Sequence, residues 1–134
     1  MERRAPGRSG IVSKKRVPIV DGNELNLELA SFLLTRDGLQ VATALDGESA
    51  LAQVAAFRPD LVLMDIQLPQ TDGFELTRRL RADPATRGLF IVAFTAYAMK
   101  GDEARMLASG CDGYISKPID VAAFASQVRA HLVK

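Results

Sequence analysis

Five short apolar runs alternate along this chain with segments in which apolar residues recur at helical spacing. The run from Leu61 to Met64 is apolar throughout, which is typical of a strand covered on both faces, as in a parallel sheet. Successive parallel strands need crossover connections, and these are right-handed. The alternation therefore predicts an α/β fold with a doubly wound, five-stranded parallel sheet and five helices.

The expected strands cover residues 17–20, 39–43, 61–64, 89–94 and 113–115. The expected helices begin near Glu24, Asp46, Asp72, Asp102 and Asp120, and residues such as Asp37-Gly38 and Asp83-Pro84 end them. Helical spacing predicts the residues on their inner faces. These are Leu25, Leu29, Phe32 and Leu33 in the first helix, Ala50, Leu51, Val54 and Ala55 in the second, Leu76 and Leu80 in the third, and Val121, Phe124, Val128 and Leu132 in the last.

Length and composition limit the functional classes. The 134 residues are enough for one domain, and 48% of them are hydrophobic. No apolar stretch is long enough to span a bilayer or to act as a secretion signal, so we expect a cytoplasmic protein. Cys111 is the single cysteine and His131 the single histidine, which excludes an intrachain disulfide and a cysteine-rich metal site.

Charge is unevenly distributed. Residues 1–16 hold six of the 17 basic residues and one of the 16 acidic ones, which leaves 11 basic and 15 acidic residues in the rest. We expect residues 1–15 to be a disordered basic tail and residues 16–134 to be the folded domain. A nucleic-acid contact by the tail is an alternative, but none is expected for the mildly acidic domain.

Polar side chains stand where four of the expected strands end. Asp21, Asp65 and Thr95 follow the first, third and fourth strands, and Lys117 follows the fifth. Ligands of doubly wound sheets bind beyond these carboxyl ends. Two carboxylates suit a divalent cation such as Mg²⁺, a carboxylate can attack phosphorus, and ammonium and hydroxyl groups can hold phosphoryl oxygens. Singly, each residue could be a cap, a turn or a surface charge; their joint placement is what predicts a phosphoryl site.

At these residues the sequence resembles the receiver domain of two-component response regulators, over about residues 16–134. The matching segments are Ile19-Val20-Asp21, Asn23-Glu24-Leu25-Asn26, Leu63-Met64-Asp65-Ile66-Gln67-Leu68-Pro69, Asp72-Gly73, Ala93-Phe94-Thr95-Ala96 and Gly113-Tyr114-Ile115-Ser116-Lys117-Pro118. The segment from Ala98 to Glu103 is most similar to stand-alone DivK-type regulators and to receivers of hybrid kinases. The resemblance implies a flavodoxin-like, CheY-like sheet of order 2-1-3-4-5.

The resemblance also implies roles for individual residues. Asp65 would be the phosphoacceptor, with Thr95 and Lys117 on the phosphoryl group and a cis peptide between Lys117 and Pro118. Mg²⁺ would be held by Asp21, Asp65 and the backbone carbonyl of Gln67. Thr95 and Tyr114 would form the switch, although Tyr114 alone could be a half-buried core residue. Gln67 and Tyr97 would tune the lifetime of the phosphoryl group.

The implied partners are a histidine kinase or histidine phosphotransfer protein and a downstream protein target. The target would bind the face formed by the helix at 102–109, the strand at 113–115 and the last helix. No membrane contact is expected, and the chain would be a monomer or a weak homodimer.

Two residues depart from the family pattern. Gly22 stands where a second acidic residue is usual, which predicts weaker Mg²⁺ binding and slower phosphorylation. Pro18 lies in the first strand, where it removes a backbone donor and is tolerable only near the first pairs.

Three functions are weighed. The favoured one is a single-domain response regulator, a phosphorylation-switched module and not an enzyme in the ordinary sense. Gly22 keeps open a pseudo-receiver that binds without being phosphorylated. An aspartyl-nucleophile phosphatase would need an acid at Gln67, and no glycine-rich loop for a nucleotide follows the first strand.

Overall fold

A parallel five-stranded sheet lies at the centre of the molecule in the computed structural model, which describes residues 15–66, 68, 72–96 and 102–132. The strand order is β2-β1-β3-β4-β5, so the predicted doubly wound architecture is confirmed. The strands are β1 (Arg16–Val20), β2 (Gln40–Ala44), β3 (Val62–Asp65), β4 (Ile91–Thr95) and β5 (Gly113–Ser116). Each lies within two residues of its predicted position.

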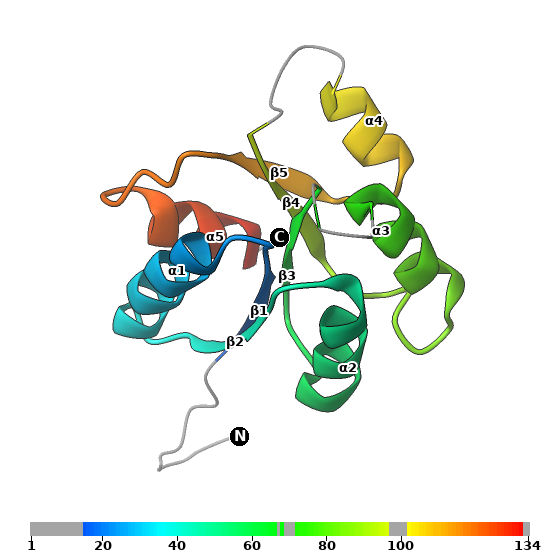
Figure 1. Cartoon of the computed structure of the whole chain (residues 1–134), viewed down its shortest axis with the longest axis horizontal. Coiled ribbons are helices and arrows are strands. Elements are labelled where there is room, and N and C mark those ends of the chain that lie inside the picture. Colours follow the sequence, from blue (N-terminus) through cyan, green and yellow to red (C-terminus); the bar gives the residue numbers. More distant parts are fainter. Residues whose placement is uncertain (1–14, 67, 69–71, 97–101, 133–134) are drawn as a thin grey trace.

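Five helices cover the two faces of the sheet (Figure 1). The helices α1 (Glu24–Arg36) and α5 (Phe124–Leu132) pack on one face. The other face is covered by α2 (Gly47–Phe57), α3 (Gly73–Ala82) and α4 (Asp102–Ala108). The chain goes from β1 to β2 on one side of β1 and then crosses to β3 on its other side, through right-handed connections. The direction in which strands are added therefore changes between β1 and β3, and ligands are expected at this switch point.

Side-chain caps fix where the first three helices begin. The side chain of Asn23 accepts a hydrogen bond from the Asn26 backbone N–H at the start of α1. Asp46 and Asp72 accept in the same way from Ser49 and Phe74 at the starts of α2 and α3. Each cap pairs a backbone donor that has no partner within its own helix.

The sheet separates two apolar cores. One lies under α1 and α5 and contains Leu34, Phe94 and Phe124 among its buried residues. The other lies under α2, α3 and α4 and contains Met64, Leu76 and Met106. Adjacent residues of β3 and β4 belong to opposite cores, which explains why their sequences are apolar throughout instead of alternating.

Part of the predicted helix burial is wrong. Residues Leu27, Ala30, Leu33 and Leu34 bury α1, whereas Leu25, Leu29 and Phe32 are exposed. This helix has apolar residues at enough positions to define two overlapping stripes, and the fold buries the stripe that faces β1, β2 and α5. Ala55 is also exposed. Val121 is exposed because it precedes α5, which begins at Phe124 and not near Asp120 as predicted.

Pro18 lies in β1 opposite Ala42 of β2. The Asp21 N–H points to β2, where it donates to the Ala44 carbonyl, whereas the Arg16 carbonyl accepts from the Asp60 N–H next to β3. Because strand residues alternate between their two neighbours, Pro18 faces β3. The registered pairs of β1 with β3 begin only at Ile19 and Leu63, so the missing donor falls before this ladder.

Arg81 ties together the end of the sheet opposite the strand carboxyl ends. Its guanidinium donates to the backbone carbonyls of Arg87, Leu89 and Gly110 and forms an ion pair of 2.6 Å with Asp112. The Asp112 carboxylate also accepts from the Ile91 N–H at the start of β4. One side chain thus fixes the loops around α3, β4 and β5 at a single point.

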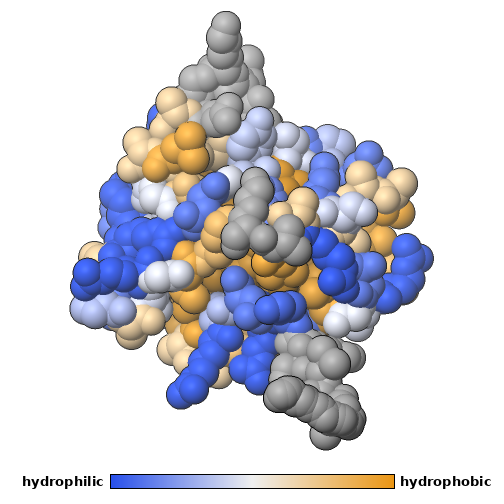
Figure 2. Space-filling view, turned by 180° about the vertical axis from the view of Figure 1, so that it is seen from behind, coloured by the Kyte–Doolittle hydropathy of each residue, from blue (hydrophilic) through white to orange (hydrophobic). Residues whose placement is uncertain are grey.

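Within the described residues, no helix is both long and apolar enough to cross a bilayer. Figure 2 shows that on the side opposite to the view of Figure 1, hydrophilic side chains surround apolar atoms near the centre.

Candidate functional site

The structure brings the predicted polar residues to one edge of the sheet. Asp65 and Thr95 are the last residues of β3 and β4, and Asp21 and Lys117 follow β1 and β5 directly. Asp21, Asp65 and Thr95 are buried. Since β1, β3, β4 and β5 are neighbours in the sheet, their carboxyl ends hold these four residues side by side.

The Lys117 ammonium lies between two carboxylates. Its Nζ atom is 2.8 Å from Asp21 Oδ2 and 3.3 Å from Asp65 Oδ2. All three side chains are largely withdrawn from solvent, with exposed fractions of 16%, 1% and 7%. A buried charge needs a partner, and here one cation is shared by two anions, so this group of three carries one net negative charge.

Lys117 is positioned by an aromatic ring under its ammonium and by a hydrogen bond from its backbone N–H. Its ammonium lies 5.0 Å from the centroid of the Phe94 ring, a favourable cation–π distance. Its backbone N–H donates to the Thr95 carbonyl at 2.8 Å, and the peptide bond between Lys117 and Pro118 is cis. The lysine thus reaches the two carboxylates from the end of β5 over an aromatic face.

Asp21 is oriented by the chain that follows it. The Asn23 backbone N–H donates to Asp21 Oδ1 at 2.9 Å. The Asn26 side-chain amide lies 3.4 Å from Asp21 Oδ2, the same oxygen that Lys117 contacts. Gly22, between Asp21 and the helix cap, contributes no side-chain oxygen.

Gly73 lets the start of α3 approach the end of β3. A Cβ atom at this position would lie 2.3 Å from the Asp65 carbonyl oxygen and 2.6 Å from the Ile66 Cα. The Gly73 N–H donates to the Ile66 carbonyl at 2.9 Å. Only glycine fits this approach without displacing the backbone that carries Asp65.

The two expected switch residues lie on adjacent strands. Thr95 is buried at the end of β4, opposite Ser116 of β5, and Tyr114 of β5 pairs with Ala93 of β4. The Tyr114 side chain is 36% exposed and lines a hollow of about 350 Å³ between β5 and α5. It is therefore partly open to solvent in this structure.

The donor chemistry suits a hard divalent cation. Asp21 and Asp65 supply carboxylate oxygens at one point, and Mg²⁺ accepts such oxygens together with several waters. Across the described part of the chain, no group of three or more His, Cys, Asp or Glu residues could hold a metal. A cation here would therefore depend on two carboxylates, water and backbone or amide oxygens.

Three predictions fall outside the described residues. They concern the backbone carbonyl of Gln67, the side chain of Tyr97 and most of the basic tail, and they stay predictions.

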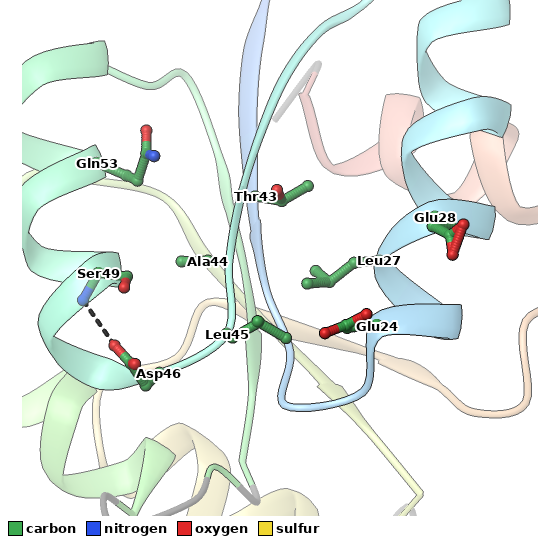
Figure 3. Close-up of a pocket in the computed structure, with 9 residues that line it drawn as sticks. All are labelled: Glu24, Leu27, Glu28, Thr43, Ala44, Leu45, Asp46, Ser49 and Gln53. Carbon is green, nitrogen blue, oxygen red and sulfur yellow. Dashed lines mark hydrogen bonds between the residues drawn. The ribbon is translucent and has the colours of Figure 1, made fainter.

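A separate hollow of about 410 Å³ lies between α1, α2 and the end of β2 (Figure 3). Its lining includes Glu24, Glu28 and Asp46, and it contains none of the four residues at the strand ends. Hydrogen bonds from Ser49 hold the pKa of Asp46 below its usual value. These bonds cap α2, so the acid has a structural explanation.

Sequence reasoning gave no role to Asn26 or Phe94 and did not connect Gly73 with Asp65. Helical spacing places Asn26 less than one turn from the N-terminus of α1, and Phe94 directly precedes Thr95 in β4. Neither pattern alone indicates that the two side chains meet Asp21 and Lys117.

Comparison with known proteins agrees with this geometry. Residues 17–129 match the model of the response regulator receiver domain. The polar-differentiation response regulator DivK of Brucella anthropi is 44% identical over 118 residues, which cover 88% of this chain and 96% of that protein. Its counterpart from Brucella ovis is 43% identical with the same coverage.

Solved structures have the same fold. A CheY-like receiver domain protein from Methanospirillum hungatei has a TM-score of 0.80 and 28% identity, covering 90% of this chain and 95% of that chain. The chemotaxis response regulator CheY4 of Vibrio cholerae has a TM-score of 0.83 and 24% identity, covering 89% and 99%.

Proposed function

This chain belongs to the response regulator receiver domain family, and on that basis we propose that Asp65 accepts a phosphoryl group from a phosphohistidine of a histidine kinase or histidine phosphotransfer protein. The observation that carries the proposal is the position of Lys117, whose Nζ atom is 3.3 Å from Asp65 Oδ2. An ammonium group at this distance can bind the oxygens of a phosphoryl group on Asp65.

In the proposed transfer, an Asp65 carboxylate oxygen forms the new bond to phosphorus as the phosphorus–nitrogen bond of the donor breaks. The donor imidazole leaves with a proton from solvent. Lys117 then exchanges its contact with the Asp65 carboxylate for one with the phosphoryl oxygens, and the Thr95 hydroxyl donates to another of them. Burial of Asp65 and Thr95 keeps water from competing for these contacts.

We propose that Mg²⁺ is held by Asp21, Asp65 and the Gln67 backbone carbonyl. When bound, the cation neutralises charge on the transferring phosphoryl group. Gly22 leaves this site with one oxygen ligand and one negative charge fewer than the family pattern. The Lys117 ammonium already contacts the Asp21 carboxylate at 2.8 Å. Mg²⁺ has to compete with this ammonium for the carboxylate, so weak binding is the expected result.

The proposed output surface is the face formed by α4, β5 and α5. Movement of Thr95 toward the phosphoryl group would vacate space that Tyr114 then occupies, which changes the hollow lined by Tyr114, Gln127 and His131. A downstream protein that binds this face would thereby distinguish the two states. We propose cytoplasmic action by protein contacts.

Gly22 also supports a second candidate, a pseudo-receiver that binds its partner without being phosphorylated. In that case the 2.8 Å contact between Lys117 and Asp21 would be the permanent state of the site. The intact set of Asp65, Thr95 and Lys117 favours the phosphorylated switch.

Intact mass after incubation with Mg²⁺ and a small phosphodonor separates the two candidates. The switch predicts a phosphoryl adduct on the wild-type chain and none on Asp65→Asn. Absence of an adduct on the wild type, with its appearance in Gly22→Asp, would favour the pseudo-receiver. An adduct that persists in Asp65→Asn would refute Asp65 as the acceptor.

A further inference from the structure

Asn26 lies beside the cation site without a role in the proposed transfer. It belongs to the first turn of α1, and its backbone N–H donates to the Asn23 side chain at 3.1 Å. The helix cap therefore fixes the backbone position of Asn26, from which its side chain extends. Its amide Nδ2 lies 3.4 Å from Asp21 Oδ2, and the side chain is half-buried.

The amide shares its carboxylate oxygen with Lys117. Asp21 Oδ2 is 2.8 Å from Lys117 Nζ and 3.4 Å from Asn26 Nδ2, so the two donors approach one oxygen. If a divalent cation displaces Lys117 from Asp21, the amide remains next to the carboxylate that binds the cation. An asparagine side chain also carries a carbonyl oxygen with two lone pairs, a ligand that hard cations accept.

Gly22 defines what this site lacks. It offers no side-chain oxygen, and the described carboxylates at the site are Asp21 and Asp65. A neutral amide can supply an oxygen without adding a third negative charge beside a single lysine. Asn26 is placed to do this from the helix, on the side of Asp21 where its amide already makes contact.

We propose that Asn26 completes the cation site of this chain in place of the oxygen missing at Gly22, an inference that rests on the proposed function. Without a cation, Asn26 donates to Asp21 and holds that carboxylate in position. With a divalent cation bound, it offers its carbonyl oxygen to the cation or to a water of the hydration shell. Asn26 is thus a positioning residue for Asp21 and a part of the cation site.

The test is a double-mutant cycle on Mg²⁺ affinity without a phosphodonor. The wild-type chain, Asn26→Ala, Gly22→Asp and the double variant are titrated with Mg²⁺ by calorimetry, since the chain contains no tryptophan as a fluorescent reporter. We expect Asn26→Ala to weaken binding about tenfold in the Gly22 background. In the Gly22→Asp background we expect a loss of about twofold or less, because the added carboxylate takes over, so that the two changes are not additive.

A spectroscopic readout separates this role from a merely structural one. The side-chain amide signal of Asn26 should shift on addition of Mg²⁺, while that of Asn23, which caps the helix, should move much less. Asn26→Asp should bind Mg²⁺ more tightly than the wild type, because a carboxylate then replaces the amide oxygen. Ser31→Ala, further along α1, is the matched control and should leave the affinity unchanged.

Equal affinity losses from Asn26→Ala in both backgrounds, or no loss in either, would overturn the proposal. So would a wild-type chain that binds no Mg²⁺, or an Asn26→Asp variant that binds it more weakly. Failure of Asp65 to take a phosphoryl group would refute the proposed function, but the double-mutant cycle on Mg²⁺ affinity could still be interpreted. Formation of the phosphoryl adduct on Asp65, together with an unchanged Mg²⁺ affinity in Asn26→Ala, would refute only the role of Asn26.

Discussion

Lys117 determines the charge state of the site at the scale of single residues. Two buried carboxylates compete for one ammonium, and the shorter contact is with Asp21 and not with the proposed acceptor Asp65. A phosphoryl group on Asp65 would draw the ammonium toward itself, and a divalent cation would take its place at Asp21. Both ligands are therefore expected to act by moving the same side chain.

Lys117→Met should destabilise the protein because it removes the ammonium that contacts both Asp21 and Asp65. Loss of one partner from a buried charge group costs about 3 kcal/mol of unfolding free energy. Urea unfolding in the absence of divalent cations measures this loss, and addition of Mg²⁺ should recover part of it. A loss below about 1 kcal/mol would mean that solvent screens these charges far more than their burial indicates.

The buried thiol of Cys111 is expected to make the stability of the folded protein depend on pH in the alkaline range. Burial raises the pKa of its thiol above the usual value, while Ser109 and Thr77 oppose this by contacting the sulfur. The folded state then holds the proton more tightly than the unfolded chain, so this contribution is complete below the unfolded pKa and is lost as pH rises through the folded one. We expect stability to fall above pH about 9.

Denaturation measured between neutral pH and pH about 10 checks this, with Cys111→Ala as the comparison. The variant should lose stability less steeply over that range. The native thiol should also react slowly with a disulfide reagent at neutral pH and rapidly after unfolding. Rapid reaction of the native thiol would contradict the burial argument.

At the scale of elements, α1 has a buried and an exposed apolar stripe, and they should differ in energetic weight. Leu34 is fully buried, so Leu34→Ala should cost about 2–5 kcal/mol of unfolding free energy. Phe32 is 60% exposed, and Phe32→Ala should change it by about 0.5 kcal/mol or less. Chemical denaturation of the two variants under the same conditions tests the assignment, and similar costs would show that the buried face is misassigned.

Gly73→Ala should disturb both the fold and the site. The added methyl group would meet the backbone of Asp65 and Ile66, so α3 must move away from β3, at a cost of about 1–3 kcal/mol. Since this backbone carries Asp65, phosphoryl acceptance should slow as well. Gly88→Ala is the matched control, because nothing lies within 4 Å of the place that its added methyl group would take. An effect of equal size in both variants would argue against a specific contact at Gly73.

The sequence predicted the order of elements and the strand-end residues because both follow from local patterns. Apolar runs give the strands, and parallel connectivity brings Asp21, Asp65, Thr95 and Lys117 to one edge. The buried stripe of α1 did not follow, since leucines at 25, 27, 29, 33 and 34 satisfy two helical faces and only packing against β1, β2 and α5 selects one. The Asn26 contact also depends on tertiary placement, namely on how α1 leaves the loop after β1.

For the whole molecule, Gly22→Asp should make stability depend more strongly on divalent cations. Without a cation, a further carboxylate near Asp21 and Asp65 adds repulsion that one lysine cannot balance, so the melting temperature should fall. At saturating Mg²⁺ the variant should gain more than the wild type, because the stabilisation grows with the ratio of cation concentration to the dissociation constant. Melting curves over a range of Mg²⁺ concentrations measure this, and parallel curves for the two proteins would contradict it.

The short ladder between β1 and β3 has a consequence for how the molecule opens. Pro18 provides no donor toward β3, and only two registered pairs, Ile19 with Leu63 and Val20 with Met64, join these strands. The ladder at this seam, between β2–β1 on one side and β3–β4–β5 on the other, is therefore short, although the Asp60 and Leu61 N–H groups also donate to the Arg16 carbonyl. Lys117, from the second half, holds Asp21, from the first, across this seam. In amide hydrogen exchange, protection of the Val20 N–H should therefore change if a cation or a phosphoryl group displaces Lys117 from Asp21, which would couple local opening of the sheet to occupancy of the site.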